Sequence, residues 1–266
     1  MNGIKRNLKS LCLFWRYREL LINLTHREIA QRYKQSILGY AWVILNPLFQ
    51  LLVMNFVFST ILKIPSLNVP FIIFLSVGLL PWNLFTQTLT SSTTMLVANN
   101  TLITKIYFPR EILVYATMIA KIVDFLFSCL ILVIFLIIFK IPPTIMLLWL
   151  PFIFVIQFFF TAGLALILAS FNLFYRDIQY MLSFLLILWM YMTPILYPVE
   201  IIPYRFKFVL SLNPMAVIVN AYRQVIIGGS MPNIINLSIG FLTSLIVFLV
   251  GYSLFKKLEG EFADYV

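Results

Sequence analysis

The sequence predicts an all-α integral membrane protein with six transmembrane helices, and three observations support this fold class. The 266 residues are 62% hydrophobic and 11% charged, with a mean hydropathy of +1.00, outside the range of soluble globular domains. Six apolar runs are each close to the ~20 residues that a spanning helix needs. Lys and Arg stand at the ends of these runs and form no continuous basic face, so the net charge of +10 indicates membrane topology and not nucleic-acid binding.

Residues 1–36 are predicted to form a cytoplasmic, amphipathic, interfacial segment. Apolar side chains are mixed with basic ones over residues 3–22, as in a helix that lies in the lipid headgroup layer. We expect no cleavable signal peptide there. Thr25 and Glu28 have the spacing of a capping box, so a second helix is expected to begin at Thr25 and to run into the membrane without a linker. The segment is either a simple basic anchor or a surface that docks a partner.

The predicted transmembrane domain covers residues 37–257, and a short solvated cytoplasmic tail follows at 258–266. An even number of crossings puts both termini on one side of the membrane. Thirteen Lys and Arg residues then lie on that side and five on the other, which predicts cytoplasmic termini. The spans are expected at about 37–62, 71–95, 112–139, 145–171, 178–197 and 234–255.

The segment before the last span is too apolar for a free loop, and Pro203 and Pro214 divide it into pieces too short to cross. We expect two short re-entrant-like helices at the outer face, about 203–212 and 214–227. They either close a pathway or pack as a simple hairpin.

Two charged residues fall inside the third predicted span. Lys121 and Asp124 are three residues apart, so they can neutralise each other on one helix face. An unpaired charge at mid-membrane costs at least ~2.5–3.5 kcal/mol, which favours an intramembrane ion pair. A part in gating or substrate passage is the alternative.

Aromatic side chains recur on one face of the first and fifth predicted spans. Such faces can stack on sugar rings, which would suit the wall of a channel. Because 17% of all residues are aromatic, a stripe can equally face lipid or a neighbouring helix. The first stripe consists of Trp42, Phe49 and Phe56 with Asn46, and the second of Tyr180, Phe184 and Tyr191.

The cytoplasmic loop ANNTLITKIYFPRE carries an apolar side that water disfavours. Its members are Ile103, Ile106, Tyr107 and Phe108. An apolar knob on a short loop is suited to a groove on a motor protein.

The sequence contains no motif that indicates an enzyme. GxxxxGK[ST], HExxH and GxSxG are all missing, so the chain is not expected to hydrolyse ATP itself. His26 is the only histidine, and Cys12 and Cys129 lie at different predicted depths, so neither a metal site nor a disulfide is expected. The chain is therefore expected to bind no cofactor.

Four segments resemble, in order, the permease subunits of ABC exporters for O-antigen, capsule and teichoic acid polymers. The similarity covers about residues 27–257. The segments are RYKQSILGYAWVILNPL, then GLLPW with TLITKIYFPREIL, then FNLFYRDIQYMLSFLLILWMYMTPILYP, and finally LNPMAVIVNAYRQ.

This resemblance implies a permease of the bacterial inner membrane that pairs with a second copy of itself and with two ATPase subunits, which hold the ATP and Mg. The implied cargo is a lipid-linked glycan or polyol-phosphate polymer. The resemblance also implies residue roles. The ATPase contact would comprise Glu28, Arg32, Tyr33, Lys105, Tyr107, Phe108, Pro109 and Arg110. The cytoplasmic mouth would comprise Arg176 and Asp177, and the outer gate Pro203, Asn213, Pro214, Tyr222 and Arg223. The two aromatic stripes would line the channel.

Two other functions remain open at this stage. Related exporters with the same layout move small lipophilic drugs or lipids, and such a route would not need the aromatic stripes. A membrane enzyme or scaffold for glycan assembly is the second alternative, and the shortage of carboxylates and histidines in the spans disfavours it.

Overall fold

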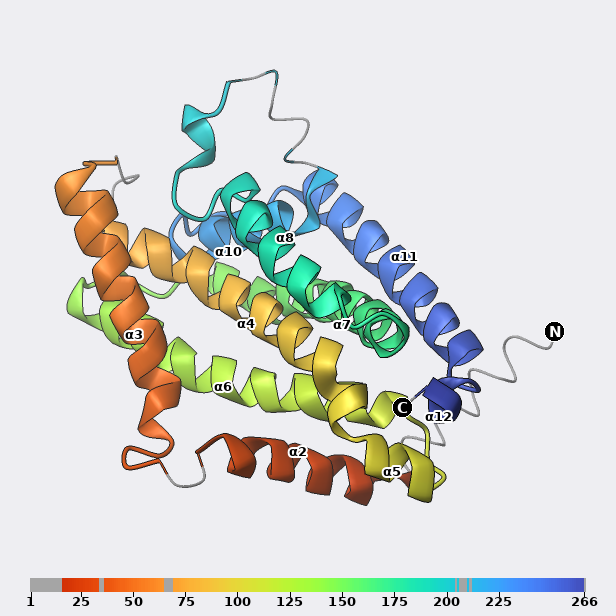
Figure 1. The fold of residues 1–266 in the computed structure, drawn as a ribbon. Coiled ribbons are helices and arrows are strands. Elements are labelled where there is room, and N and C mark those ends of the chain that lie inside the picture. The colour runs from red at the N-terminus through yellow and green to blue at the C-terminus, as the bar shows by residue number, and fades with distance from the viewer. Residues whose placement is uncertain are drawn as a thin grey trace.

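The computed structural model describes residues 16–33, 36–64, 69–203, 205, 210 and 212–265, and these residues form an all-helical bundle (Figure 1). The longer α-helices are α2 (Arg18–Tyr33), α3 (Ala41–Asn55), α4 (Phe71–Ala98), α6 (Glu111–Ile138), α7 (Leu150–Phe174), α8 (Ile178–Met192), α10 (Pro214–Ile226) and α11 (Ile234–Leu258). The shorter ones are α5 (Asn100–Lys105) and α12 (Phe262–Tyr265), and single turns of other helix types cover Phe56–Ile61, Ile145–Trp149 and Val199–Ile201.

Five helical segments of the described residues are long and apolar enough to cross a membrane. They are Ala41–Ile61, Phe71–Ala98, Glu111–Ile138, Ile145–Phe174 and Ile234–Leu258. The fifth predicted span, 178–197, is instead the 15-residue helix α8, which rises only about 22 Å. Thr193 leaves the helical conformation and Pro194 follows it, so α8 ends five residues before the predicted boundary.

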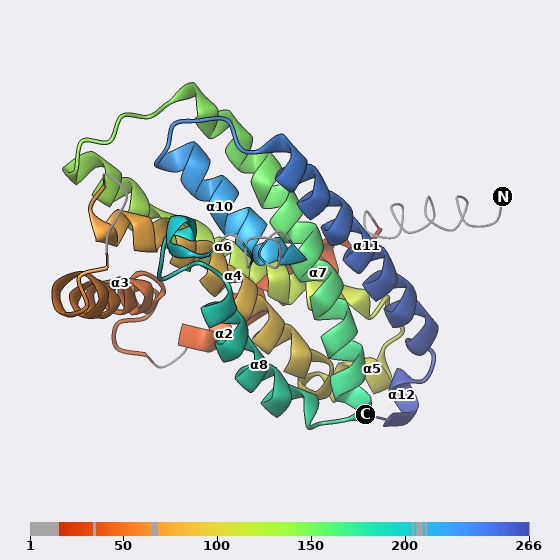
Figure 2. The ribbon, with the colours of Figure 1, turned by 90° about the horizontal axis from the view of Figure 1, so that it is seen from above.

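The buried centre of the bundle is α4, which packs against α6, α7 and α10 (Figures 1 and 2). At its far side, α7 and α11 lie side by side along their length (Figure 2). Glycine permits this close approach, because a Cβ added at Gly251 would lie 2.3 Å from the carbonyl oxygen of Gly163. Small residues at a helix contact let two backbones meet, and ring contacts such as Phe159 with Phe248, with centroids 5.2 Å apart, join the same helices further along.

The helix predicted to begin at Thr25 begins earlier, and that prediction was wrong. Thr25 lies inside α2, is buried, and its hydroxyl donates a hydrogen bond to the carbonyl of Leu21 at 2.8 Å. The same hydroxyl reaches the carbonyl of Ala116 at 3.5 Å, so α2 lies along the first turns of α6 (Figure 1). α2 ends at Tyr33 and α3 begins at Ala41, so the two are not one continuous helix.

The structure contains one of the two short helices predicted before the last span. α10, Pro214–Ile226, agrees closely with the prediction at 214–227. Pro214 stands in its first turn, where a missing N–H costs nothing, and the Asn213 side chain accepts the Met215 N–H at 3.1 Å. Most of the other predicted helix, 203–212, lies outside the described residues.

The C-terminal segment was predicted to be a solvated tail, and the structure corrects this. Phe262 of α12 is fully buried and contacts the rings of Phe174 and Phe255, with centroids 6.1 and 5.2 Å away. α12 also packs against α5. Near α5, Arg27 of α2 donates to the side-chain oxygen of Asn99. The first and last described helices therefore lie at the same end of the bundle.

Gly251→Leu should destabilise the fold strongly, by at least about 1–3 kcal/mol, because the new side chain would meet the backbone of α7. The measurement is the thermal unfolding midpoint of the purified protein in detergent. Gly260→Ala is the matched control, since a Cβ there meets nothing within 4 Å. Equal midpoints for the two variants would contradict the close contact of α7 and α11.

Candidate functional site

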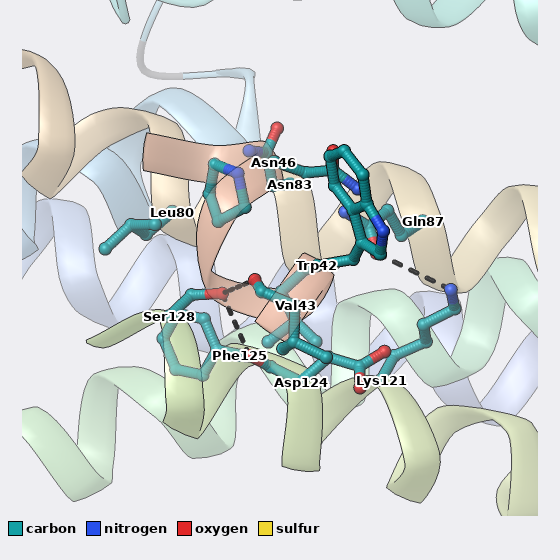
Figure 3. Close-up of a pocket in the computed structure, with 12 residues that line it drawn as sticks. Trp42, Val43, Asn46, Leu80, Asn83, Gln87, Lys121, Asp124, Phe125 and Ser128 are labelled. Carbon is teal, nitrogen blue, oxygen red and sulfur yellow. Dashed lines mark hydrogen bonds between the residues drawn. The ribbon is translucent and has the colours of Figure 1, made fainter. Parts of the chain in front are cut away.

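A polar cavity of about 70 Å³ opens between the start of α3 and the middle of α4 and α6 (Figure 3). Its polar lining residues come from all three helices. At one end, Lys121 donates to the side-chain oxygen of Gln87 at 3.5 Å, and at the other, Ser128 donates to the carbonyl oxygens of Asp124 and Val43. The polar lining consists of Asn46, Asn83, Gln87, Lys121, Asp124 and Ser128, with Trp42 beside them.

The sequence predicted Lys121 as the ion-pair partner of Asp124, and this prediction was wrong. Asp124 instead forms a salt bridge with Arg32 of α2. The cause is the position of α2, which runs beside α6 and delivers a guanidinium to the carboxylate from a different helix. Lys121 still interacts with Asp124 electrostatically, but among the described residues the one hydrogen bond that its ammonium makes is to Gln87. The bridge therefore fastens α2 to α6.

The contact with α2 divides α6 into a first part that packs against α2 and a second part that is apolar. From Phe125 to Ile138, α6 has 14 apolar or small residues, which rise about 21 Å. Before Asp124, α6 is flanked by α2, whose polar sequence is unsuited to hydrocarbon. Sequence reasoning missed this because it treated α6 as an isolated span.

The loop between α4 and α6 presents a smaller apolar knob than the sequence predicted. Tyr107 is 95% exposed and Ile106 is also exposed, whereas Phe108 is only 5% exposed and Ile103 is buried. Ile103 lies on the buried side of α5, and Phe108 turns inward after the helix has ended, so half of the predicted apolar side belongs to the core. Of the predicted contact residues, Lys105 is exposed, and Glu28, Arg32, Pro109 and Arg110 are half-buried.

The C-terminus holds this loop in place. Glu259 accepts the backbone N–H of Arg110 at 2.9 Å, and Arg110 donates in turn to the carbonyl of Glu259. Lys256 bridges Glu111 at 2.6 Å and Glu259 at 2.9 Å. Nothing in the sequence indicates these long-range pairs, because the acidic residues of the tail have the composition of a solvated segment.

The two aromatic stripes point away from the core of the single chain. Phe49, Phe56, Tyr180, Phe184 and Tyr191 are all exposed. In this arrangement they face lipid or another protein chain. Trp42 is half-buried at the polar cavity, so the first stripe begins at the cavity and continues along the outside of α3.

The residues predicted for the cytoplasmic mouth and for the outer gate lie at opposite ends of the bundle and differ in exposure. Arg176 and Asp177 are exposed between α7 and α8, at the end of the bundle that carries α12. At the opposite end, Pro203 is exposed, and Asn213 and Pro214 are half-buried. Asn213 joins α10 to α8, because it accepts from the Trp189 indole and donates to Thr193, both at 3.0 Å.

Tyr222 and Arg223 lie on the buried face of α10, not on an exposed gate. The Tyr222 hydroxyl bonds to Gln157 at 3.2 Å. Arg223 donates to the carbonyls of Pro194 and Ile195, and its guanidinium lies 3.6 Å from the Phe74 ring centroid. These contacts brace α10 against α4, α7 and the turn after α8.

Comparison with known proteins identifies the family. The model of the ABC-2 type transporter family matches residues 19–227, most of the chain and nearly all of the helices described above. The chain belongs to this family. It is therefore a permease subunit, and ATP hydrolysis belongs to a separate ATPase subunit.

Curated relatives resemble the permease over almost its full length. An O-antigen export system permease protein, RfbA, of Klebsiella pneumoniae is 33% identical over 247 residues, which cover 92% of this chain and 94% of that protein. The protein of the same name from Myxococcus xanthus is 31% identical over 252 residues, covering 94% and 96%.

A double-mutant cycle tests the corrected partner of Asp124. Arg32→Met and Asp124→Leu should each destabilise the permease, and the double variant should recover about 1–3 kcal/mol of the summed loss, because neither charge is then left unpaired. The free energy of unfolding in detergent is the measurement. Lys121→Met combined with Asp124→Leu is the matched control. For this pair we expect the losses of unfolding free energy in the two single variants to add more nearly than for Arg32 and Asp124. A larger coupling energy for Lys121 than for Arg32 would restore the original pairing.

Proposed function

We propose that this permease exports a lipid-linked polysaccharide across the bacterial cytoplasmic membrane, together with a second copy of itself and two ATPase subunits. The observation that carries the proposal is its similarity, at 31–33% identity and over more than nine-tenths of its length, to proteins named for O-antigen export. Capsule polysaccharides are cargoes of the same chemical class, and teichoic acids, which are polyol-phosphate polymers, are the alternative lipid-linked cargo.

The topology proposed has six crossings and cytoplasmic termini. The excess of Lys and Arg at the end carrying α2, α5 and α12 supports this orientation. α8 is short for a span, yet it begins next to the α12 end and finishes against α10 at the opposite end. Together with the buried turn after Met192, it would complete the sixth crossing.

The proposed coupling route starts at the exposed residues Ile106 and Tyr107. ATP binding by the ATPase subunits would move this knob, and the move would reach the spans by two connections. The first connection is the Glu259 clamp, by which Glu259 at the end of α11 binds Arg110 of the loop. The second is α2, which Arg27 holds against the loop at Asn99 and Arg32 holds against α6 at Asp124. The ATP and Mg would be held by the ATPase subunits alone.

The proposed channel lies between the two permease copies. Five large aromatic side chains on the outside of α3 and α8 support this arrangement, since a second copy is one surface that could cover them. Stacking of sugar rings on aromatic faces is tolerant of sequence, so a polymer could slide along them.

Tyr107→Ala should abolish most ATP-dependent export while leaving the thermal midpoint unchanged, because its side chain is almost fully exposed. Phe108→Ala should instead lower the stability of the fold by about 3–5 kcal/mol, since it empties a buried site. Both variants are to be measured for ATPase co-purification and for export in proteoliposomes. Normal export by Tyr107→Ala would disprove the coupling assignment.

The combined replacement of Trp42, Phe49 and Phe56 by Leu should reduce polymer export about tenfold, through lost stacking. Efflux of a small lipophilic dye should be largely retained, which separates the proposed cargo from the drug or lipid alternative. Leu at the exposed positions Phe127, Phe139 and Phe152, outside the stripes, is the matched control. Unimpaired polymer export in the first variant would mean that the stripe faces lipid.

A further inference from the structure

A second cavity, of about 370 Å³, lies between α4, α6, α7 and α10 and has an almost wholly apolar wall. It is larger than the ~150 Å³ engineered protein cavity that admits benzene. Exposed residues at its rim, among them Leu126 and Val133, open it towards the lipid side of the chain. Its floor includes Cys129, Leu132 and Tyr222.

The apolar cavity adjoins the polar cavity of Figure 3. Leu80 of α4 and Phe125 of α6 line both of them. Along α6 the polar cavity uses Lys121 to Ser128, and the apolar cavity continues from Phe125 to Leu136. A charged compartment and a hydrocarbon compartment thus follow each other along one helix face.

The dimensions match one leaflet of a membrane. From Phe125 to Leu136, α6 rises about 16 Å, close to half of a ~30 Å hydrocarbon core. The polar compartment lies towards the end that carries α2. With the proposed topology, on which this step depends, that end is cytoplasmic, so the two compartments have the polarity of an inner-leaflet lipid.

The polar compartment has unused hydrogen-bonding groups. Lys121 has three N–H donors, and the structure records one long bond for it, to Gln87 at 3.5 Å. Arg32 already neutralises Asp124, and among the described residues no carboxylate lies within ion-pair distance of Lys121. Oδ1 of Asp124 is buried without a partner. Asp124 and Glu28 attract the Lys121 ammonium and Arg32 repels it, all without a direct bond, and of the two carboxylates only Asp124 lines the cavity.

We propose that the two adjoining cavities bind one anionic phospholipid of the inner leaflet. Its phosphate bonds to Lys121, a headgroup hydroxyl donates to Asp124, and one acyl chain fills the apolar cavity. The small polar compartment suits a compact headgroup and excludes one that carries a glycan. The bound lipid would fill a gap beside α10 and so stabilise the contact of α10 with α4 and α6.

The test uses the permease purified with its ATPase subunit in nanodiscs of phosphatidylglycerol or phosphatidylcholine. Native mass spectrometry counts the lipids that remain bound, and a phosphatidylglycerol with a photoreactive acyl chain marks the peptide that it contacts. We expect one retained phosphatidylglycerol per permease, crosslinked within residues 125–136 of α6, and about tenfold less retained phosphatidylcholine.

Two variants remove the two halves of the site separately. Lys121→Gln should lower phosphatidylglycerol retention about tenfold and Lys121→Arg should keep it, because only the first removes the charge. Cys129→Phe should block the crosslink by filling the apolar cavity. Leu130→Phe, at an exposed neighbouring position outside the cavity, is the matched control and should crosslink normally.

Retention and crosslinking that are unchanged in both Lys121→Gln and Cys129→Phe would overturn the proposal. The proposal would also be overturned if the lipid-linked polymer, and not added phospholipid, prevented the crosslink to this peptide. The cavities would then bind the cargo. Polymer export is measured in parallel, so a failure of the lipid site is distinguishable from a failure of the proposed export function.

Discussion

The contact on which the α2 end of the permease depends is the salt bridge between Arg32 and Asp124. A buried carboxylate in an apolar bundle needs a cation, and here the cation within bonding distance comes from α2 and not from the helix that carries Asp124. This requirement holds α2 along α6 and fixes the depth of the polar cavity. It also leaves Lys121 available for a ligand.

A similar constraint operates at the opposite end, where Arg223 is buried. Its guanidinium is satisfied by two backbone carbonyls in the turn after α8 and by the face of Phe74. Gly78 leaves the space that the guanidinium occupies, because a Cβ there would lie 2.8 Å from it. At each end of the bundle, an arginine on a shorter helix thus contacts a long helix. Arg32 of α2 contacts α6 at one end, and Arg223 of α10 contacts α4 at the other.

Sequence reasoning predicted the fold class, five of the six spans and α10, because each depends on local composition, length or proline. It failed where a residue's role depends on a distant segment. The spacing of Lys121 and Asp124 favoured a local pair, and nothing local could show that α2 would bring Arg32 there. Phe108 and Phe262 have the composition of loop and tail residues, and only tertiary packing shows that both are buried.

The glycine contact between α7 and α11 has a mechanical consequence. The backbones meet at Gly163 and Gly251, and the ring pairs Phe159–Phe248 and Phe152–Phe241 join the same two helices further along. Sliding α11 on α7 would bring larger side chains to the glycine contact and would separate these rings, so we expect the two helices to move as one body. The contacts of Glu259 with Arg110 tie the loop before α6 to this pair, so a displacement of the loop would be passed to both helices together.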